Sequence, residues 1–116
     1  MQEFNLYVLD NASENSTNIL CQRILPGSAK YLRHSKNLGM VGNWNYALNT
    51  GNSDHFMILH DDDELSPNFV LEAVKLIKNN NNLSFFHSAA HLIDHDGDVV
   101  GKSNASYSPV MSGKNF

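Results

Sequence analysis

A short apolar segment that runs directly into consecutive acidic residues constrains the fold of this chain more than any other feature. His55–Leu59 (His-Phe-Met-Ile-Leu) is a continuous apolar run, as in strands of parallel sheets that are covered on both faces. Asp61–Asp63 follow almost at once, and Ser66-Pro67 then provides an N-cap residue and a proline suited to the first helical position. The apolar residues of that helix recur on one face, at Val70, Leu71, Val74 and Ile77. A buried strand, an acidic loop and an amphipathic helix in this order predict an α/β fold.

The rest of the chain continues the alternation of strands and helices. We expect a strand at Phe4–Leu9, a short helix that ends at Pro26-Gly27, a strand at Tyr31–Arg33, a helix at Gly42–Leu48 and a buried strand at Leu83–Phe86. Leu92-Ile93 and Val99-Val100, which flank Asp96-Gly97, predict a β-hairpin. These elements indicate one α/β domain over residues 1–116, with a mostly parallel sheet flanked by helices and ligands at the carboxyl ends of its strands.

Size, charge and cysteine content exclude several classes of protein. The chain has 116 residues, enough for one domain, and its net charge of −4 argues against a nucleic-acid partner. No apolar run approaches the roughly 20 residues of a transmembrane helix, and Met1-Gln2-Glu3 does not begin a signal peptide. The single Cys21 excludes a disulfide framework and a multi-cysteine metal site. We expect a cytoplasmic protein, with peripheral attachment at the inner face of the membrane as one form of that location.

The acidic run is the strongest candidate for a metal site. Three adjacent carboxylates, Asp61, Asp62 and Asp63, repel one another unless a cation or solvent neutralises them. Their hard oxygen atoms suit Mg²⁺ or Mn²⁺, which commonly hold substrate phosphates at the same time. An acidic helix N-terminus, favoured by the helix dipole, is the alternative interpretation, and it suits Glu64 and Asp63 better than the whole run.

Two further polar segments lie where a ligand could be bound. Asp10-Asn11 ends the first predicted strand, and its alternative role is an Asx-turn or a helix cap. The loop from Asn37 to Asn45 contains Gly39 and Gly42, which permit close backbone approach or a positive φ angle. Trp44, in the same segment, is expected to pack rather than to stack on a ligand. Parallel strands that both end in acidic residues place those residues at one edge of the sheet.

These segments together resemble a known family. Val8-Leu9-Asp10-Asn11-Ala12-Ser13, Asn37-Leu38-Gly39, Gly42-Asn43-Trp44-Asn45-Tyr46-Ala47-Leu48 and Ile58-Leu59-His60-Asp61-Asp62-Asp63-Glu64-Leu65-Ser66-Pro67 resemble, in order and spacing, the family 2 glycosyltransferases of GT-A fold. The resemblance covers residues 4 to about 78, with a weaker similarity at Asp96-Gly97. It implies an inverting enzyme that transfers a sugar from a nucleotide-diphosphate-sugar donor to an acceptor hydroxyl on a saccharide or a lipid-linked molecule. Mg²⁺ or Mn²⁺ would bridge the diphosphate of the donor.

The resemblance also implies roles for individual residues. Asp10 and Asn11 match the family's acidic pair at the base and ribose pocket, with Asn11 in a position where the family often has Asp. Asn37 and Gly39 match the loop that lines the nucleotide pocket, and Asn45 and Asp61 are further expected contacts of the nucleotide-sugar.

The acidic run matches the family's DXD motif in one of two registers. Asp61 and Asp63 form the pair if the motif is read literally, whereas counting back from Pro67 places His60 and Asp62 in the two acidic positions. We favour Asp62 as the principal metal ligand, with Asp61 and Asp63 as contributors.

Two departures from the family pattern affect the expected activity. The family's usual first strand has no counterpart before Phe4, and its catalytic carboxylate lies beyond the position that matches Phe116. We therefore expect a fragment of a transferase with most of the donor site, no assignable catalytic base, and little activity by itself. The alternative is a non-catalytic nucleotide- and metal-binding fragment that needs a partner or the missing chain, and turnover with sugar nucleotides separates the two hypotheses.

The later acidic and histidine residues fit simpler explanations. Asp94, Asp96 and Asp98 suggest a calcium loop, but Val99 and Ala105 stand at positions that such a loop reserves for glycine and glutamate. The hairpin interpretation is preferred there. His87, His91 and His95 have a spacing of four residues, but their strand-like surroundings argue against a zinc-binding helix face.

Overall fold

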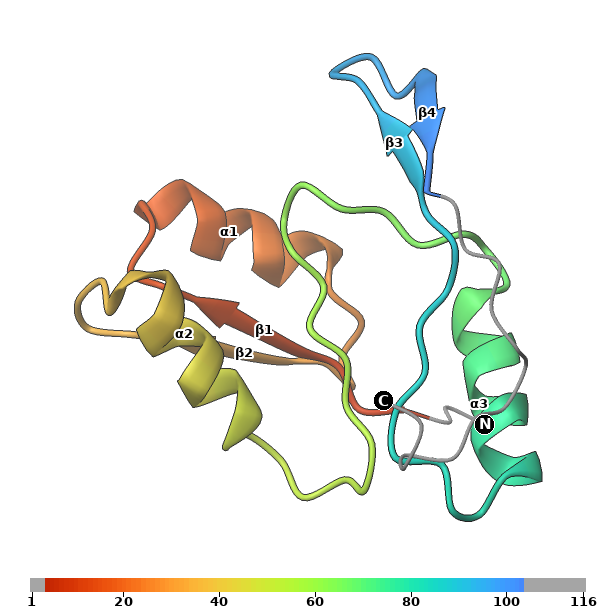
Figure 1. Cartoon of the computed structure of the whole chain (residues 1–116). Helices are drawn as coiled ribbons and strands as arrows, with labels where there is room; N and C mark the ends of the chain where they lie inside the picture. The colour runs from red at the N-terminus through yellow and green to blue at the C-terminus, as the bar shows by residue number, and fades with distance from the viewer. Residues whose placement is uncertain (1–3, 104–116) are drawn as a thin grey trace. The chain divides into compact units, whose positions relative to one another are not determined.

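The computed structural model describes residues 4–103, within which the chain forms three helices and four strands (Figure 1). The chain divides into two compact units, Met1–Val74 and Lys75–Phe116, and each is described by itself. No helix in the described range is both long and apolar enough to cross a membrane.

The first unit is built on a β–α–β motif. Strand β1 (Tyr7–Asp10) leads through helix α1 (Asn15–Ile24) into strand β2 (Lys30–Arg33), which pairs with β1 in parallel. The register pairs Val8 with Tyr31 and Asp10 with Arg33, so these four residues share one face of the strand pair. The predicted strands and the first helix are therefore confirmed, although β1 begins later than the expected Phe4.

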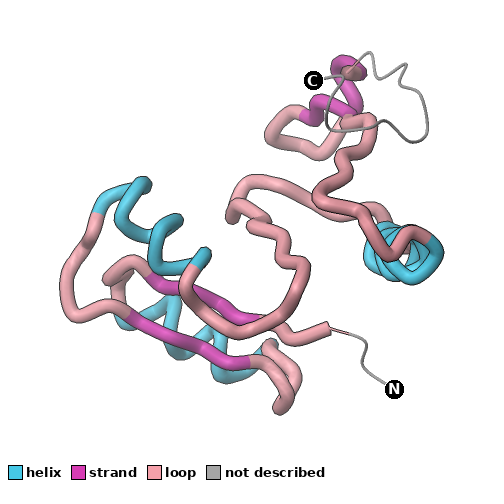
Figure 2. The backbone as a smooth tube through the Cα atoms, turned by 60° about the horizontal axis from the view of Figure 1, so that its bottom comes forward, coloured by secondary structure: helices cyan, strands magenta, loops and turns pink. Residues whose placement is uncertain are grey.

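Helices cover both faces of the strand pair. Figures 1 and 2 show β1 and β2 between α1 and α2 (Gly39–Leu48), which begins three residues before the predicted start at Gly42. Gly39 has a φ angle of 72°, in the left-handed region that glycine tolerates best.

Among residues 4–103, only Asp10 and Cys21 are buried, so the most deeply buried residue of this unit carries a charge. Cys21 lies on α1 and is a free thiol.

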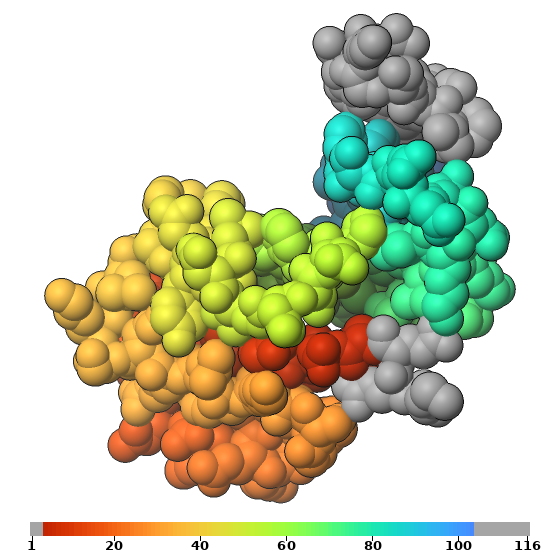
Figure 3. Space-filling view, turned by 90° about the horizontal axis from the view of Figure 1, so that it is seen from below, coloured from red at the N-terminus to blue at the C-terminus, as the bar shows by residue number. Residues whose placement is uncertain are grey.

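The strand predicted at 55–59 is wrong. These residues belong to no strand, and the two sheets in the described part of the chain contain two strands each. A strand exists only where a neighbour accepts and donates its backbone hydrogen bonds, and β1 forms its ladder with β2 rather than with this segment. The apolar side chains consequently stay accessible, with Phe56 at 68% and Leu59 at 47% exposure. In the space-filling view the segment lies on the surface, in yellow-green (Figure 3).

The predicted strand at 83–86 is also absent, since neither sheet includes it. The described sheets are one parallel pair and one antiparallel pair, so a mostly parallel sheet is not what these residues form. Apolar composition indicated burial at both segments, but it carried no information about a partner strand.

The second unit contains the predicted hairpin. Helix α3 (Phe69–Asn79), which spans the division between the units, precedes strand β3 (His91–Ile93) and strand β4 (Val99–Lys102). The two strands pair antiparallel with an irregularity between Leu92 and Ile93, and Gly97 in the turn has a φ angle of 86°. The hairpin prediction is confirmed, as is a helix after Ser66-Pro67.

Candidate functional site

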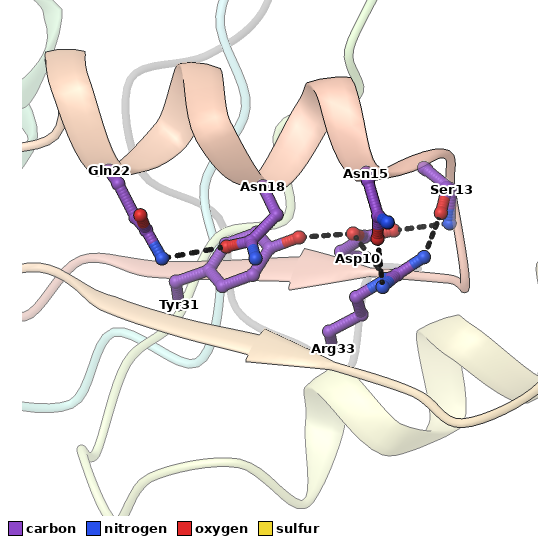
Figure 4. Close-up of polar contacts among 7 residues, drawn as sticks. All are labelled: Asp10, Ser13, Asn15, Asn18, Gln22, Tyr31 and Arg33. Carbon is purple, nitrogen blue, oxygen red and sulfur yellow. Dashed lines mark hydrogen bonds and ion pairs between the residues drawn. The ribbon is translucent and has the colours of Figure 1, made fainter.

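The end of β1 holds a buried carboxylate that contacts three neighbouring groups. The backbone N–H of Ser13 donates to Asp10 Oδ1 over 2.7 Å, and the Tyr31 hydroxyl donates to Asp10 Oδ2. Arg33 Nε forms an ion pair with the same Oδ2 at 3.3 Å. Figure 4 shows these side chains between the strand pair and α1. The Asp10 side chain has no exposed surface, whereas that of Arg33 is 34% exposed.

The remaining donors of Arg33 fasten the turn between β1 and α1. Arg33 Nη2 donates to the Ser13 carbonyl oxygen, and Nη1 donates to Asn15 Oδ1 over 3.2 Å. One guanidinium group therefore holds the strand end, the turn and the first residue of α1 together (Figure 4). Such charge-assisted contacts are among the stronger hydrogen bonds in proteins.

The environment shifts the pKa of two of these groups. Desolvation by burial alone would raise the pKa of Asp10, but hydrogen bonds from Tyr31 and Ser13, with the Arg33 charge, together hold it below the ordinary 3.8. Desolvation, followed by the hydrogen bond to Asp10, raises the pKa of Tyr31 to about 12. Asp10 is therefore an ionised carboxylate whose acceptor sites are largely occupied within the protein.

Sequence reasoning missed Tyr31 and Arg33. Their signal was the alternation in Tyr31-Leu32-Arg33, which places a hydroxyl and a guanidinium on one face of β2. The parallel register then brings both to the face of Asp10. The predicted nucleotide contact of Asp10 stays a prediction, and the Asx-turn alternative describes the observed Ser13 bond.

A second polar cluster joins Asn11 to the loop before α2. Asn11 Nδ2 donates to Asn37 Oδ1 over 3.0 Å and to the Gly39 carbonyl oxygen over 3.3 Å. In the opposite direction, the backbone N–H of Leu38 donates to Asn11 Oδ1 over 2.8 Å. Within the loop, the backbone N–H of Gly39 donates to Asn37 Oδ1 over 2.7 Å. The structure thus brings together Asn11, Asn37 and Gly39, three of the predicted nucleotide contacts, and we call them the amide cluster.

The amide cluster retains hydrogen-bonding capacity. An amide oxygen carries two lone pairs, and the described contacts use one of those on Asn11 Oδ1. Asn45, a further predicted contact, is exposed on α2 and makes no hydrogen bond to the cluster among the described residues; its carbonyl oxygen accepts from Asn49 Nδ2. The cluster also fixes the first residue of α2, because it binds both the N–H and the carbonyl oxygen of Gly39. Leu38, at the N-cap, has no side-chain capping bond of its own.

The acidic run lies in an exposed turn. The backbone N–H of Asp63 donates to the His60 carbonyl oxygen over 3.3 Å, and Asp61, Asp62 and Asp63 are all exposed. Within residues 4–103, none of the three carboxylates takes part in a hydrogen bond or an ion pair. Asp10 is bound by its neighbours, whereas these carboxylates are open to a ligand.

Aromatic rings connect the acidic run and β2 to α2. Trp44 lies edge-to-face against His60, with ring centroids 5.1 Å apart and an interplanar angle of 75°. His34, after β2, makes a similar contact with Tyr46 at 4.5 Å and a 3.1 Å hydrogen bond with Asn43 Oδ1. The Trp44 ring therefore packs against His60.

The hairpin holds a different acidic group. Asp94, His95 and Asp96 are the one set of three potential ligands in the described range whose atoms all lie within 4.8 Å. Asp94 Oδ1 accepts from the backbone N–H groups of Asp96 and Asp98, each over 3.0 Å, and His95 contacts Asp96 at 3.2 Å. These bonds shape the turn, in agreement with the hairpin interpretation.

The carboxylates of the acidic run are the type of donor that a hard divalent cation binds, but the three do not all lie within 4.8 Å of one another, so they would supply one or two ligands rather than a closed set. Mg²⁺ is commonly held by one or two carboxylates together with water and substrate phosphates, so a closed protein cage is not required. Exposed carboxylates without protein partners at 61–63 meet this condition.

Comparison with known proteins gives one clear relationship. The family model described as "Glycosyl transferase family 2" matches residues 1–107, which is nearly the whole chain. Neither curated proteins nor solved structures gave a match. The family consists of glycosyltransferases with the GT-A fold, which use a nucleotide-sugar donor and an acceptor. With its strand-end polar residues, amide cluster and acidic run inside the matched region, this chain belongs to glycosyl transferase family 2.

Proposed function

We propose that this chain binds the nucleotide-diphosphate-sugar donor of an inverting, DXD-type transfer, with a divalent cation at Asp61–Asp63. The observation that carries the proposal is the contrast between the two kinds of carboxylate. The Asp10 carboxylate is buried and engaged, whereas those at 61–63 are exposed and have no partner among the described residues. Exposed carboxylates without protein partners can hold a divalent cation together with water and substrate phosphates.

Asp62 is the proposed principal ligand of Mg²⁺ or Mn²⁺, and Asp61 and Asp63 contribute through water or the ribose. When bound, the cation supplies positive charge that stabilises the leaving diphosphate. The turn closed by the bond from Asp63 N–H to the His60 carbonyl holds the carboxylates in one short segment. The chain's own contribution is positioning of the donor.

The amide cluster is the proposed nucleotide side of the site. Asn11 Oδ1 has one lone pair outside the described contacts, which suits the N3–H of a pyrimidine base. Asn37 and Gly39 fix the orientation of the Asn11 amide, so that its free lone pair has one direction. Asp10 supports the adjoining turn through Ser13. No described residue is proposed as the base that deprotonates the acceptor hydroxyl.

Calorimetric titration of uridine diphosphate, with and without Mn²⁺, tests the proposal. We expect Mn²⁺ to increase the affinity, and Asp62→Asn to abolish that increase. Glu64→Gln is the matched control, since it removes the same charge two residues along the chain and is expected to keep the Mn²⁺ effect. Equal affinity with and without Mn²⁺ in the unmodified protein would contradict the proposal. A second assay, release of uridine diphosphate from uridine-diphosphate sugars, reports whether binding leads to turnover.

A further inference from the structure

We infer that Trp44 is a positioning residue of the donor site, and that it sets the place of the acidic run through its contact with His60. The inference rests on the proposed function, because it concerns how the proposed metal ligands are held. Trp44 itself contacts neither metal nor nucleotide in this assignment.

Among the described residues, the ring contact with Trp44 is the only interaction between the His60 side chain and a helix or strand. Trp44 is half-buried on α2, and its ring meets the exposed His60 ring edge-to-face at 5.1 Å. His60 in turn accepts the backbone hydrogen bond of Asp63, so it anchors both the beginning and the end of the turn. The carboxylates between them have no partner among residues 4–103 that would orient them. Their position therefore depends on His60, and that of His60 depends on Trp44.

Helix α2 is itself fixed at two other points. The amide cluster holds its first residue, Gly39, and the contacts of His34 with Asn43 and Tyr46 hold its middle against the residue after β2. Trp44 projects from the same middle turn. One helix thus links the proposed nucleotide side to the proposed metal side, and the rise from Gly39 to Trp44, five positions later, is about 7.5 Å along its axis.

This linkage matters because one donor must contact both sides simultaneously. A site made of a fixed amide cluster and a freely placed acidic turn loses the entropic advantage of a preset spacing. Removal of the Trp44 ring should therefore weaken the part of nucleotide binding that depends on metal, and leave the metal-free part unchanged. A purely structural role for Trp44 would weaken both parts equally.

The test compares uridine diphosphate affinity with and without Mn²⁺ in three variants of the full chain. Trp44→Leu and His60→Ala each remove the ring contact from one side, and Trp44→Phe retains an aromatic ring. We expect either removal to lower the Mn²⁺-dependent affinity about tenfold, as loss of an outer-shell partner commonly does, with metal-free affinity within twofold of the unmodified protein. We expect Trp44→Phe to retain most of the Mn²⁺ effect. The double variant Trp44→Leu, His60→Ala should lose no more than either single variant, because both remove one contact.

Each result has a definite meaning. If the unmodified protein shows no Mn²⁺ effect, the proposed function fails and takes this inference with it. Three outcomes would overturn the inference alone when the unmodified protein does show the Mn²⁺ effect. Trp44→Leu could keep that effect, or it could lose metal-free and Mn²⁺-dependent affinity equally. In the double variant, the losses of Trp44→Leu and His60→Ala could add. His60→Ala keeps the test available if Trp44→Leu does not fold. As a second measurement, the indole N–H signal of Trp44, the chain's one tryptophan, should broaden on addition of Mn²⁺ and not of Mg²⁺; an unbroadened signal at saturating Mn²⁺ would also overturn the inference.

Discussion

Replacement of Asp10 with asparagine tests whether this carboxylate holds the first unit together. Asparagine has nearly the same shape, so it can still accept from the Ser13 N–H, but it turns an amide N–H₂ or a neutral oxygen toward Tyr31 and Arg33. The variant therefore loses the charge that three donors share, and it leaves the Arg33 guanidinium without its ionic partner.

The magnitude follows from the burial of the two partners. Removal of one member of a buried ion pair costs roughly 3–5 kcal/mol, and the 34% exposure of the Arg33 side chain lowers that range because water can solvate the remaining charge. We expect the free energy of unfolding at pH 7 to fall by about 2–3 kcal/mol, which is a large part of the roughly 5–15 kcal/mol typical of a domain. The melting temperature should fall by roughly 10–20 °C on the scale of a domain of this size.

Urea unfolding, followed by the fluorescence of Trp44, measures this loss at several pH values. The folded-state pKa of Asp10 lies below 3.8, so its stabilising contribution is present above that value and is lost as the pH falls through the folded-state pKa. The difference between the unmodified protein and Asp10→Asn should therefore be full at pH 7 and shrink below pH 4. Asp54→Asn, at an exposed position, is the control. An Asp10→Asn variant as stable at pH 7 as this control, or a difference that does not change with pH, would refute the reasoning.

Three further predictions concern the same unit. Tyr31→Phe should remove the phenolate absorbance change of Tyr31, which we expect near pH 12 because burial and the bond to Asp10 raise the pKa of Tyr31 to about 12. The difference in absorbance between the two proteins at about 295 nm measures this change, and a difference that develops near pH 10 would contradict the prediction. Asn11→Ala should weaken pyrimidine nucleotides by about 1–3 kcal/mol and leave purine nucleotides unchanged in calorimetry, whereas a uniform loss would mark Asn11 as a loop organiser only. Gly39→Ala should destabilise the fold by roughly 1–2 kcal/mol in urea, because its φ angle of 72° is strained for an L-residue; Gly27→Ala, with no positive φ angle and open space around its Cβ position, is the control that should change little.

Local signals were sufficient to predict the elements that depend on local interactions. Pro26-Gly27 ended α1, the apolar face after Ser66-Pro67 predicted α3, and Asp96-Gly97 predicted the turn between β3 and β4. Each of these is decided by residues within a few positions along the chain. The start of α2 was predicted three residues late because Gly39 enters the helix with a left-handed φ angle, which the amide cluster supports from 26 to 28 residues away.

The long-range features could not be predicted in the same way. The segment 55–59 has the composition of a buried strand, but a strand needs a partner, and hydropathy does not identify one. The amide cluster was predicted only as a set of residues near one edge, and its hydrogen bonds depend on the path of the loop 37–39. Tyr31 and Arg33 were missed because their role depends on the parallel register with β1, which is a tertiary property.

The two groups of carboxylates in the first unit differ in role: Asp10 supports the fold, and those at 61–63 are the proposed metal ligands. A carboxylate that is buried and accepts several hydrogen bonds, as Asp10 does, has little free energy left to gain from a ligand. Exposed carboxylates that have no protein partner, as at 61–63, keep their acceptor sites available to a cation. The same residue type at the ends of two apolar segments therefore has opposite surroundings, and the difference arises from β2. Because β2 places Tyr31 and Arg33 beside β1 and no described strand pairs with 55–59, the Asp10 carboxylate is bound within the protein, and the Asp62 carboxylate stays exposed, where we propose that it binds the cation.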